Sequence, residues 1–309
     1  SVFLGDQLTE ILESIRDGKP YSQKEAAEMK IGVHTLPRFP KDTTDRNRTS
    51  PFAFTGNKFE FRMLGSAFSI SGPNVILNTI VSEELSQFAD ELESAADFTS
   101  ALDTLVKREL KAHSRIVFNG NSYSSEWPIE AEKRGLLNLR TTPDALPYFI
   151  SDKNVALFTK HKVFTKAELF SRYEILLENY VKVLDIEAKT MVRMVRKNII
   201  PAAFSYSRSL ADTALSMKSV SPDLSTTAES AMLATMSELS AQLYERNTAL
   251  EKTLYEARAV EDLKERALAY AYQVVPAMET LRAAVDKTEV NCAKTYWPYP
   301  TYGEMLTSV

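Results

Sequence analysis

The chain of 309 residues is long enough for one large or two ordinary domains. Apolar residues make up 44% of it and charged residues 25%, which is the composition of a globular protein with a sizeable core. A net charge of −4 gives no electrostatic reason to expect nucleic acid or an anionic membrane as a partner.

Further features favour a cytoplasmic protein. No segment approaches the ~20 apolar residues of a membrane-spanning helix, and the first residues, SVFLGDQLTE, lack the basic region of a signal peptide. Cys292 is the single cysteine, so the chain has no internal disulfide and no thiolate metal cluster.

The first part of the chain predicts a helix, a loop and a hairpin. Apolar residues at helical spacing predict a short helix over residues 5–19. Residues 20–48 have weak periodicity and several prolines, so we expect mostly loop there. Residues 52–54 and 58–63 alternate around a Thr-Gly-Asn sequence, which predicts a β-hairpin.

The next part predicts mainly helices. Residues 71–92 and 97–118 each predict a helix, and residues 142–169 predict a set of short helices and turns. From Thr165 onward, apolar residues recur at spacings of three and four and predict long helices. Pro201 should kink or break them.

Two periodic runs, residues 232–257 and 263–285, predict neighbouring helices of an antiparallel bundle. Their apolar stripes fit bundle core better than a cofactor site. The tail, residues 296–306, is aromatic and proline-rich, and we expect it to pack on a partner surface. The predicted fold class is mainly α with a small β-hairpin, an α+β fold.

The hairpin carries the residues of most chemical interest. Successive side chains of a strand point to opposite faces, so Lys58, Glu60 and Arg62 would share one face. Such a row is either an ordinary solvated ladder or part of an active site. The bulky apolar side, with Phe59 and Phe61, indicates a strand pinned in a core that presents its charges into a cleft.

Other chemistries have little support in the sequence. His34, His113 and His161 show no paired metal-ligand spacing, and Cys292 has no local signature of a nucleophile. Neither a P-loop nor a Gly-x-Gly-x-x-Gly sequence is present. The basic run MVRMVRKN fits a solvated helix face.

The stretch DRNRTSPFAFTGNKFEFR, residues 45–62, resembles the Asn-Arg-Ser/Thr and basic-x-Glu-x-Arg motifs of glutamine synthetases. Continued to residue 81, it is similar to the type III branch of that family. Residues 161–189 are weakly similar to the helical end of the family's catalytic domain, and residues 1–15 to a segment just after its glutamate-binding loop. The resemblance implies the carboxy-terminal part of a longer enzyme.

The family makes γ-glutamyl phosphate from glutamate and ATP, and ammonia then displaces the phosphate. By motif position, the resemblance implies that Glu60 binds the Mg²⁺ or Mn²⁺ ion that bridges the ATP phosphates. It implies that Arg62 holds glutamate near the γ-phosphate and that Arg48 lies on the phosphate side, both as catalytic residues. Arg48 and Lys58 would bind ATP. The implied enzyme is cytoplasmic and self-associates into a large ring.

One position departs from the family pattern. Many members have a second arginine where this chain has Ala53, which leaves the role of Lys58 open. The resemblance places the other metal ligands and most of the catalytic barrel before Ser1, and neighbouring subunits complete family sites. We therefore expect the 309-residue chain alone to be inactive.

We expect residues 1–189 to form the carboxy-terminal part of the catalytic domain. Residues 190–309 would form a helical extension that packs between subunits, and one long helix can cross this boundary. Two alternatives stay open: a non-catalytic helical scaffold in which the charged strand is decoration, and a related carboxylate–amine ligase that uses a different amine.

Overall fold

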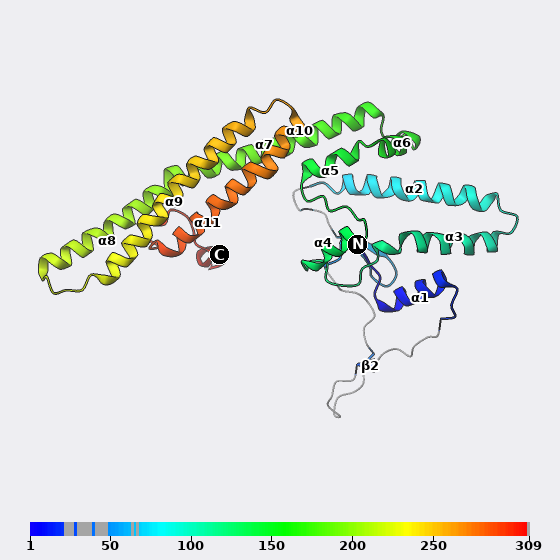
Figure 1. Cartoon of the computed structure of the whole chain (residues 1–309), viewed down its shortest axis with the longest axis horizontal. Coiled ribbons are helices and arrows are strands. Elements are labelled where there is room, and N and C mark those ends of the chain that lie inside the picture. The colour runs from blue at the N-terminus through cyan, green and yellow to red at the C-terminus, as the bar shows by residue number, and fades with distance from the viewer. Residues whose placement is uncertain (22–27, 30–38, 41–48, 63–64, 66–67, 308–309) are drawn as a thin grey trace. The chain divides into compact units, whose positions relative to one another are not determined.

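The computed structural model describes residues 1–21, 28–29, 39–40, 49–62, 65 and 68–307. They form two compact units, each described by itself below. The first unit comprises Ser1–Asn138 and Ala156–Phe164, and the second comprises Leu139–Val155 and Thr165–Val309. Most of the described residues are helical, as predicted (Figure 1).

The first unit contains a small sheet that includes the predicted hairpin. Strand β4 (Phe52–Phe54) pairs antiparallel with β5 (Phe59–Phe61) and parallel with β1 (Val2–Phe3). Strand β1 was not predicted, because two residues carry no periodic signal. A second sheet, of β2 (Glu28–Met29) and β3 (Phe39–Pro40), lies in the segment predicted to be mostly loop.

The helices of the first unit confirm the three predicted helical segments, and one more helix, Glu126–Lys133, was not predicted. They are α1 (Asp6–Asp17), α2 (Ser71–Glu93), α3 (Phe98–His113), the 3₁₀ helix η1 (Ser114–Ile116) and α4 (Glu126–Lys133). Helix α1 stops at Gly18, whose φ of 64° is left-handed and favours glycine. Helix α3 begins after Asp97, whose side chain accepts from the backbone N–H groups of Thr99 and Ser100.

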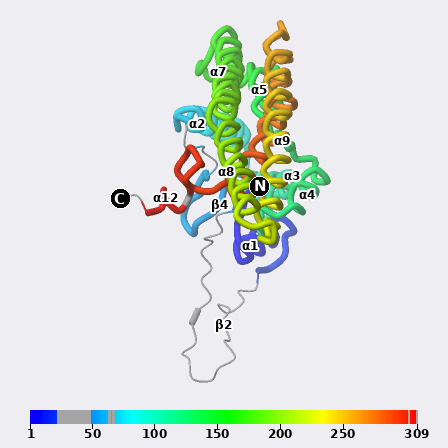
Figure 2. The backbone as a smooth tube through the Cα atoms, turned by 90° about the vertical axis from the view of Figure 1, so that its left-hand side faces the viewer, coloured from blue at the N-terminus to red at the C-terminus, as the bar shows by residue number. Residues whose placement is uncertain are grey.

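The second unit is an antiparallel helical bundle, as predicted. Helix α9 packs against both α8 and α11 (Figures 1 and 2). Fully buried leucines such as Leu243, Leu250 and Leu281 form the core. The elements are α5 (Thr142–Phe149), α7 (Lys166–Met194), η2 (Val195–Ile199), α8 (Ile200–Val220), α9 (Thr227–Arg258), α10 (Leu263–Ala269), η3 (Tyr270–Val274), α11 (Val275–Asn291) and α12 (Tyr302–Thr307). Helix α6 (Asp152–Lys160) contributes residues to both units.

We expected a kink or a break at Pro201, and no break occurs, because α7, η2 and α8 follow one another without interruption. Segment η2 is a π-helix, and the N–H of Ile200 bonds to the carbonyl of Val195, five residues back. The wider turn provides room for a proline ring and tolerates its missing N–H. Segment η3 is also a π-helix and stands in the same position before Pro276.

Part of the aromatic tail packs on the second unit's own helices, and its packing on a partner surface stays a prediction. Tyr296, Trp297 and Tyr299 lie against the buried core cluster. The rings of Tyr206 and Tyr296 are 5.4 Å apart. The tail therefore covers part of the bundle core.

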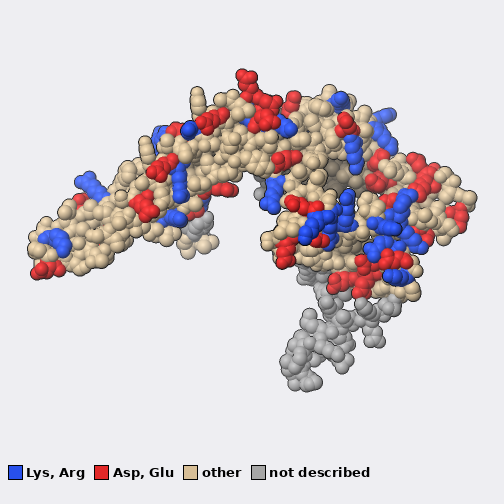
Figure 3. Space-filling model, viewed as in Figure 1, with Lys and Arg blue, Asp and Glu red and all other residues tan. Residues whose placement is uncertain are grey.

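The two compact units divide between residues 138 and 165, whereas the expected domain boundary lies near residue 189. The continuous helix of α7, η2 and α8 crosses that residue, so the boundary stays a prediction. Among the described helices, none is long and apolar enough to cross a membrane. The face drawn in Figure 3 carries acidic and basic side chains intermixed.

Candidate active-site strand

The sheet of the first unit presents two different faces. Its register aligns Phe3, Ala53 and Glu60 across β1, β4 and β5, and side chains in such a row point to the same face. The neighbouring row points to the opposite face and is entirely apolar. It consists of Val2, Phe52 and Phe61.

The three charged side chains predicted to share a face lie together. Arg62 donates from Nε and Nη2 to Oε2 of Glu60, at 3.2 and 3.1 Å. The Nζ atom of Lys58 lies 3.8 Å from Oε1 of the same carboxylate. The hydrogen bonds from Arg62 are the main reason that the pKa of Glu60 lies below its usual value. Glu60 is therefore an ionised carboxylate between two cations.

This charged cluster is accessible from solvent. The exposed fractions of the side chains are 67% for Lys58, 39% for Glu60 and 22% for Arg62. The direct cross-strand neighbour of Glu60 is Ala53, which is fully buried. An arginine at that position would point to the same face as Glu60.

The hairpin turn holds Lys58 close to the end of β4. The backbone N–H of Thr55 donates to the carbonyl of Lys58 at 2.8 Å, and the Thr55 hydroxyl reaches the same oxygen at 3.3 Å. Gly56 has a φ of 98°, a conformation that favours glycine. The Thr-Gly-Asn sequence thus predicted the position of the turn.

The apolar side of the strand is not pinned in a core, and that prediction was wrong. Phe59 and Phe61 are 49% and 43% exposed. Their neighbours are the rings of β4: Phe59 lies 5.5 Å from Phe52 and 5.2 Å from Phe54. These aromatic rings contact one another and stay partly open to solvent. The buried side chains of the sheet are Phe3 and Ala53, which belong to the row that contains Glu60.

Arg48, the other predicted cation near the hairpin, lies outside the described residues. Within the described part of the chain, no group of three or more His, Cys, Asp or Glu side chains could hold a metal ion. Glu60 is thus a single carboxylate, and it is already hydrogen-bonded to Arg62. Mg²⁺ requires near-octahedral oxygen ligation, so these residues alone do not make a metal site.

Sequence reasoning missed a second ionic cluster in the first unit. Glu83 of α2 accepts hydrogen bonds from Lys160, Gln87 and His161, at 2.9, 2.8 and 2.6 Å. These bonds, led by that from Lys160, lower the pKa of Glu83 to about 2. The partners on α6 and just after it lie more than 70 residues away along the chain, so no local pattern predicted the cluster. These hydrogen bonds connect α2 to the end of α6.

Comparison with known proteins gives one family. Residues 101–218 match the family model described as the glutamine synthetase C-terminal domain. The chain is 37% identical over 318 residues to a glutamine synthetase of Butyrivibrio fibrisolvens and 36% identical over 313 residues to a type-3 glutamine synthetase of Dictyostelium discoideum. These alignments cover 100% and 99% of the chain but 44% and 43% of the relatives. The chain therefore spans less than half the length of the curated relatives it matches.

Proposed function

The chain is related over its whole length to glutamine synthetases, type III among them, and we propose that it forms the carboxy-terminal part of such an enzyme. The longer enzyme would join ammonia to the side-chain carboxylate of glutamate through γ-glutamyl phosphate, formed with ATP. The observation that carries this proposal is the charged cluster on β5, in which Glu60 lies between Lys58 and Arg62.

The cluster has the charges that this reaction needs. Transfer of a phosphoryl group places negative charge on its oxygens, which nearby cations stabilise. The guanidinium of Arg62 already binds one carboxylate, that of Glu60, and the same group is suited to hold the carboxylate of glutamate. Lys58 and Arg48 are suited to bind the phosphates of ATP as positive charges.

The proposed metal role of Glu60 is that of one ligand among several. A bound Mg²⁺ or Mn²⁺ ion would neutralise charge on the phosphates of ATP. The described residues provide Glu60 but no complete ligand set, so the other ligands would come from outside the described residues. We assign no reaction step to the metal on these residues.

The helical extension is proposed to pack between subunits of a cytoplasmic homo-oligomeric ring. Exposed apolar side chains on one long helix support this part of the proposal, because such patches commonly mark interfaces. On α8, which lies within residues 190–309, Phe204 and Val220 are 57% and 83% exposed.

Replacement of one carboxylate tests the proposal in the longer protein. Glu60→Ala should lower glutamine formation at least about a hundredfold, because the side chain acts in the chemistry. The circular dichroism spectrum and the thermal unfolding temperature should be the same as in the parent protein, because the Glu60 side chain is 39% exposed. The matched control is Glu84→Ala, the loss of an exposed carboxylate on α2.

Normal turnover by Glu60→Ala would favour a helical scaffold in which the charged strand is decoration. Faster turnover with a larger amine than with ammonia would favour a related carboxylate–amine ligase. Loss of activity in the Glu84→Ala control as well would show that the assay reports folding rather than the site.

A further inference from the structure

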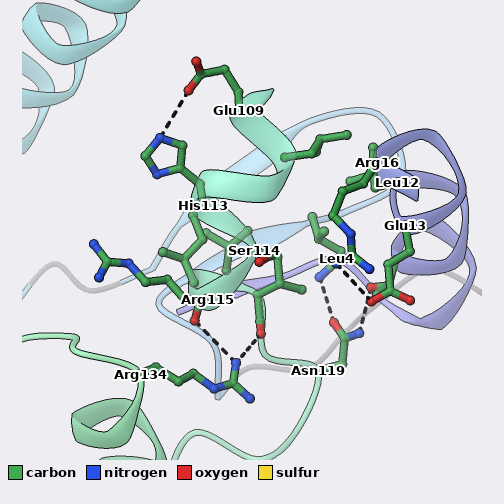
Figure 4. A pocket seen from close by; sticks show the side chains of 15 residues that line it. Leu4, Leu12, Glu13, Arg16, Glu109, His113, Ser114, Arg115, Asn119 and Arg134 are labelled. Carbon is green, nitrogen blue, oxygen red and sulfur yellow. Dashed lines mark hydrogen bonds and ion pairs between the residues drawn. The ribbon is translucent and has the colours of Figure 1, made fainter. Parts of the chain in front are cut away.

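A pocket of about 670 Å³ opens in the first unit between α1, the end of α3, η1 and β1 (Figure 4). Two of its arginines are held by carboxylates of the chain. Arg16 donates to Asp17 and lies 3.7 Å from Glu13, and Nε of Arg134 donates to Glu130 at 2.7 Å. These guanidinium groups are thus neutralised within the chain, and we assign the pocket no ligand.

Helix α7 of the second unit has apolar side chains on two opposite faces. On the opposite side from the bundle core, Leu176, Val183 and Ile186 are 42%, 43% and 64% exposed. A surface helix usually has one apolar stripe and a polar outer face, so the second stripe indicates a surface that a partner covers. The residues of the first stripe lie in the core: Leu177, Val181, Ala188 and Val192.

The exposed stripe has the spacing of a coiled-coil seam. Positions 176, 179, 183, 186 and 190 are separated by three and four residues in alternation, which is a repeat of seven. Apolar residues occupy three of these positions, and Asn179 and Thr190 occupy the other two. Because seam residues of one helix pack between seam residues of another, the partner that fits best is a second helix with the same repeat.

The seam leads into an apolar groove of about 410 Å³ beside α11. Ile186, Thr190 and Met194 line it from α7, and Met278 and Val285 line it from α11. Methionine side chains adapt to the shape of what they contact. A helix that lies along the seam would therefore also find an apolar wall beside it.

The charges beside the seam favour a second copy of α7 that runs parallel to the first. Lys182 stands directly before the seam position 183, and Glu187 directly after the seam position 186. In a parallel pair in register, these two positions meet between the helices, so Lys182 of each copy would lie next to Glu187 of the other. In an antiparallel pair, Lys182 would instead face Lys189 of the other copy and be repelled.

Both charges are accessible for this contact. Among the residues that the structure describes, no lysine or arginine pairs with Glu187. Lys182 donates to Glu178 at 2.9 Å, but the lysine side chain is 71% exposed, and such surface pairs are weak. An ammonium group has three donors, so Lys182 can contact a second carboxylate without losing Glu178.

We propose that two copies of this chain associate through α7, with the exposed seams parallel and in register. Leu176, Val183 and Ile186 would pack against the same residues of the second copy. Asn179 would meet its own counterpart, and two amides can donate to and accept from each other. The inference rests on the self-association in the proposed function, for which it names a surface.

Sedimentation velocity of the 309-residue chain tests this surface. We expect a monomer–dimer equilibrium with a dissociation constant of about 1–100 μM, as for a small interface. Ile186→Asp should weaken association at least about tenfold, because it buries a carboxylate against its counterpart. The matched control is Leu215→Asp on α8, where the leucine is 68% exposed, and it should associate as the parent chain does.

Charge reversal tests the direction of the pair. Lys182→Glu and Glu187→Lys should each weaken association about fivefold, because each places like charges opposite one another on both sides of the seam. The double variant should associate as the parent chain does. Stronger association of Lys182→Glu would contradict the parallel arrangement, because that change is favourable only opposite Lys189.

A cross-link tests the register. Asn179→Cys should form a disulfide-linked dimer on mild oxidation, because position 179 would face itself within disulfide distance. The parent chain, whose single Cys292 is buried, should stay without a cross-link.

Three results would overturn the proposal: a monomer at about 100 μM, association that Ile186→Asp leaves unchanged, or no rescue in the charge-reversed double variant. Circular dichroism checks that Ile186→Asp folds, and the charge variants, at exposed positions, keep the test decisive if it does not. None of these measurements uses turnover. A monomeric chain would therefore reject this surface, whereas only the assay of the longer protein bears on the proposed synthetase activity.

Discussion

Glu60 accepts two hydrogen bonds from Arg62 and lies near Lys58, so its charge is balanced before any substrate is present. If Arg62 is to hold the carboxylate of glutamate, it must exchange one carboxylate for another. The exchange retains the geometry of a guanidinium facing a carboxylate. At this scale the site is a set of paired charges on an accessible strand.

A buried tyrosine provides a residue-scale test of the second unit. Tyr270 is fully buried and its hydroxyl donates to Asp185 at 2.9 Å. Burial, followed by this hydrogen bond, raises the pKa of Tyr270 to about 12. An unfolded tyrosine loses its proton near pH 10, so the folded state binds the proton more tightly. The resulting stability is complete below about pH 10 and is lost as the pH rises towards 12.

Urea unfolding at pH 9 and pH 11 measures this contribution. The parent chain should lose more free energy of unfolding between these two pH values than Tyr270→Phe, which has no hydroxyl to titrate. An equal loss in both proteins would contradict the assigned environment of Tyr270.

Among the elements, α9 holds the bundle of the second unit together. Leu243 on this helix is fully buried, and Leu243→Ala should lower the free energy of unfolding by about 2–5 kcal/mol through lost burial and a residual cavity. The control Leu215→Ala, at a site 68% exposed on α8, should change it by less than about 0.5 kcal/mol. Urea unfolding measures both, and similar effects would show that α9 is not central.

Sequence periodicity predicted the helices of the bundle because their apolar stripes are the buried faces. The proline rule predicted a kink or a break at Pro201, and no break occurs there, because a rule for α-helices does not cover a π-helix. A local sequence pattern accompanies both π-helices. Residues 198–201 and 273–276 each consist of an amide residue, two β-branched residues and a proline, and each segment spans the end of a π-helix. Strand β1 was not predicted, because its partner strand, β4, lies about 50 residues further along the chain.

For the candidate site, alternation predicted that Lys58, Glu60 and Arg62 share a face, because it depends only on strand geometry. The exposure of Phe59 and Phe61 was not predictable, because it depends on which elements cover that side of the sheet. The pocket beside α1 was also missed, since its lining comes from segments about 100 residues apart.

For the whole molecule, the main question is how much of an enzyme this chain represents. It spans 43–44% of the length of the relatives that it matches. Its described residues provide one accessible carboxylate between two cations but no group of metal ligands. We therefore predict that the 309-residue chain forms no glutamine by itself, although its helical bundle is well packed.

The most direct test compares two proteins in one assay for glutamine formation from glutamate, ammonia and ATP with Mg²⁺. One is the 309-residue chain, and the other also includes the residues encoded immediately before Ser1. We predict turnover by the longer protein, its loss in the Glu60→Ala variant, and none by the shorter chain. Turnover by the 309-residue chain, or undiminished turnover by Glu60→Ala in the longer protein, would contradict the account.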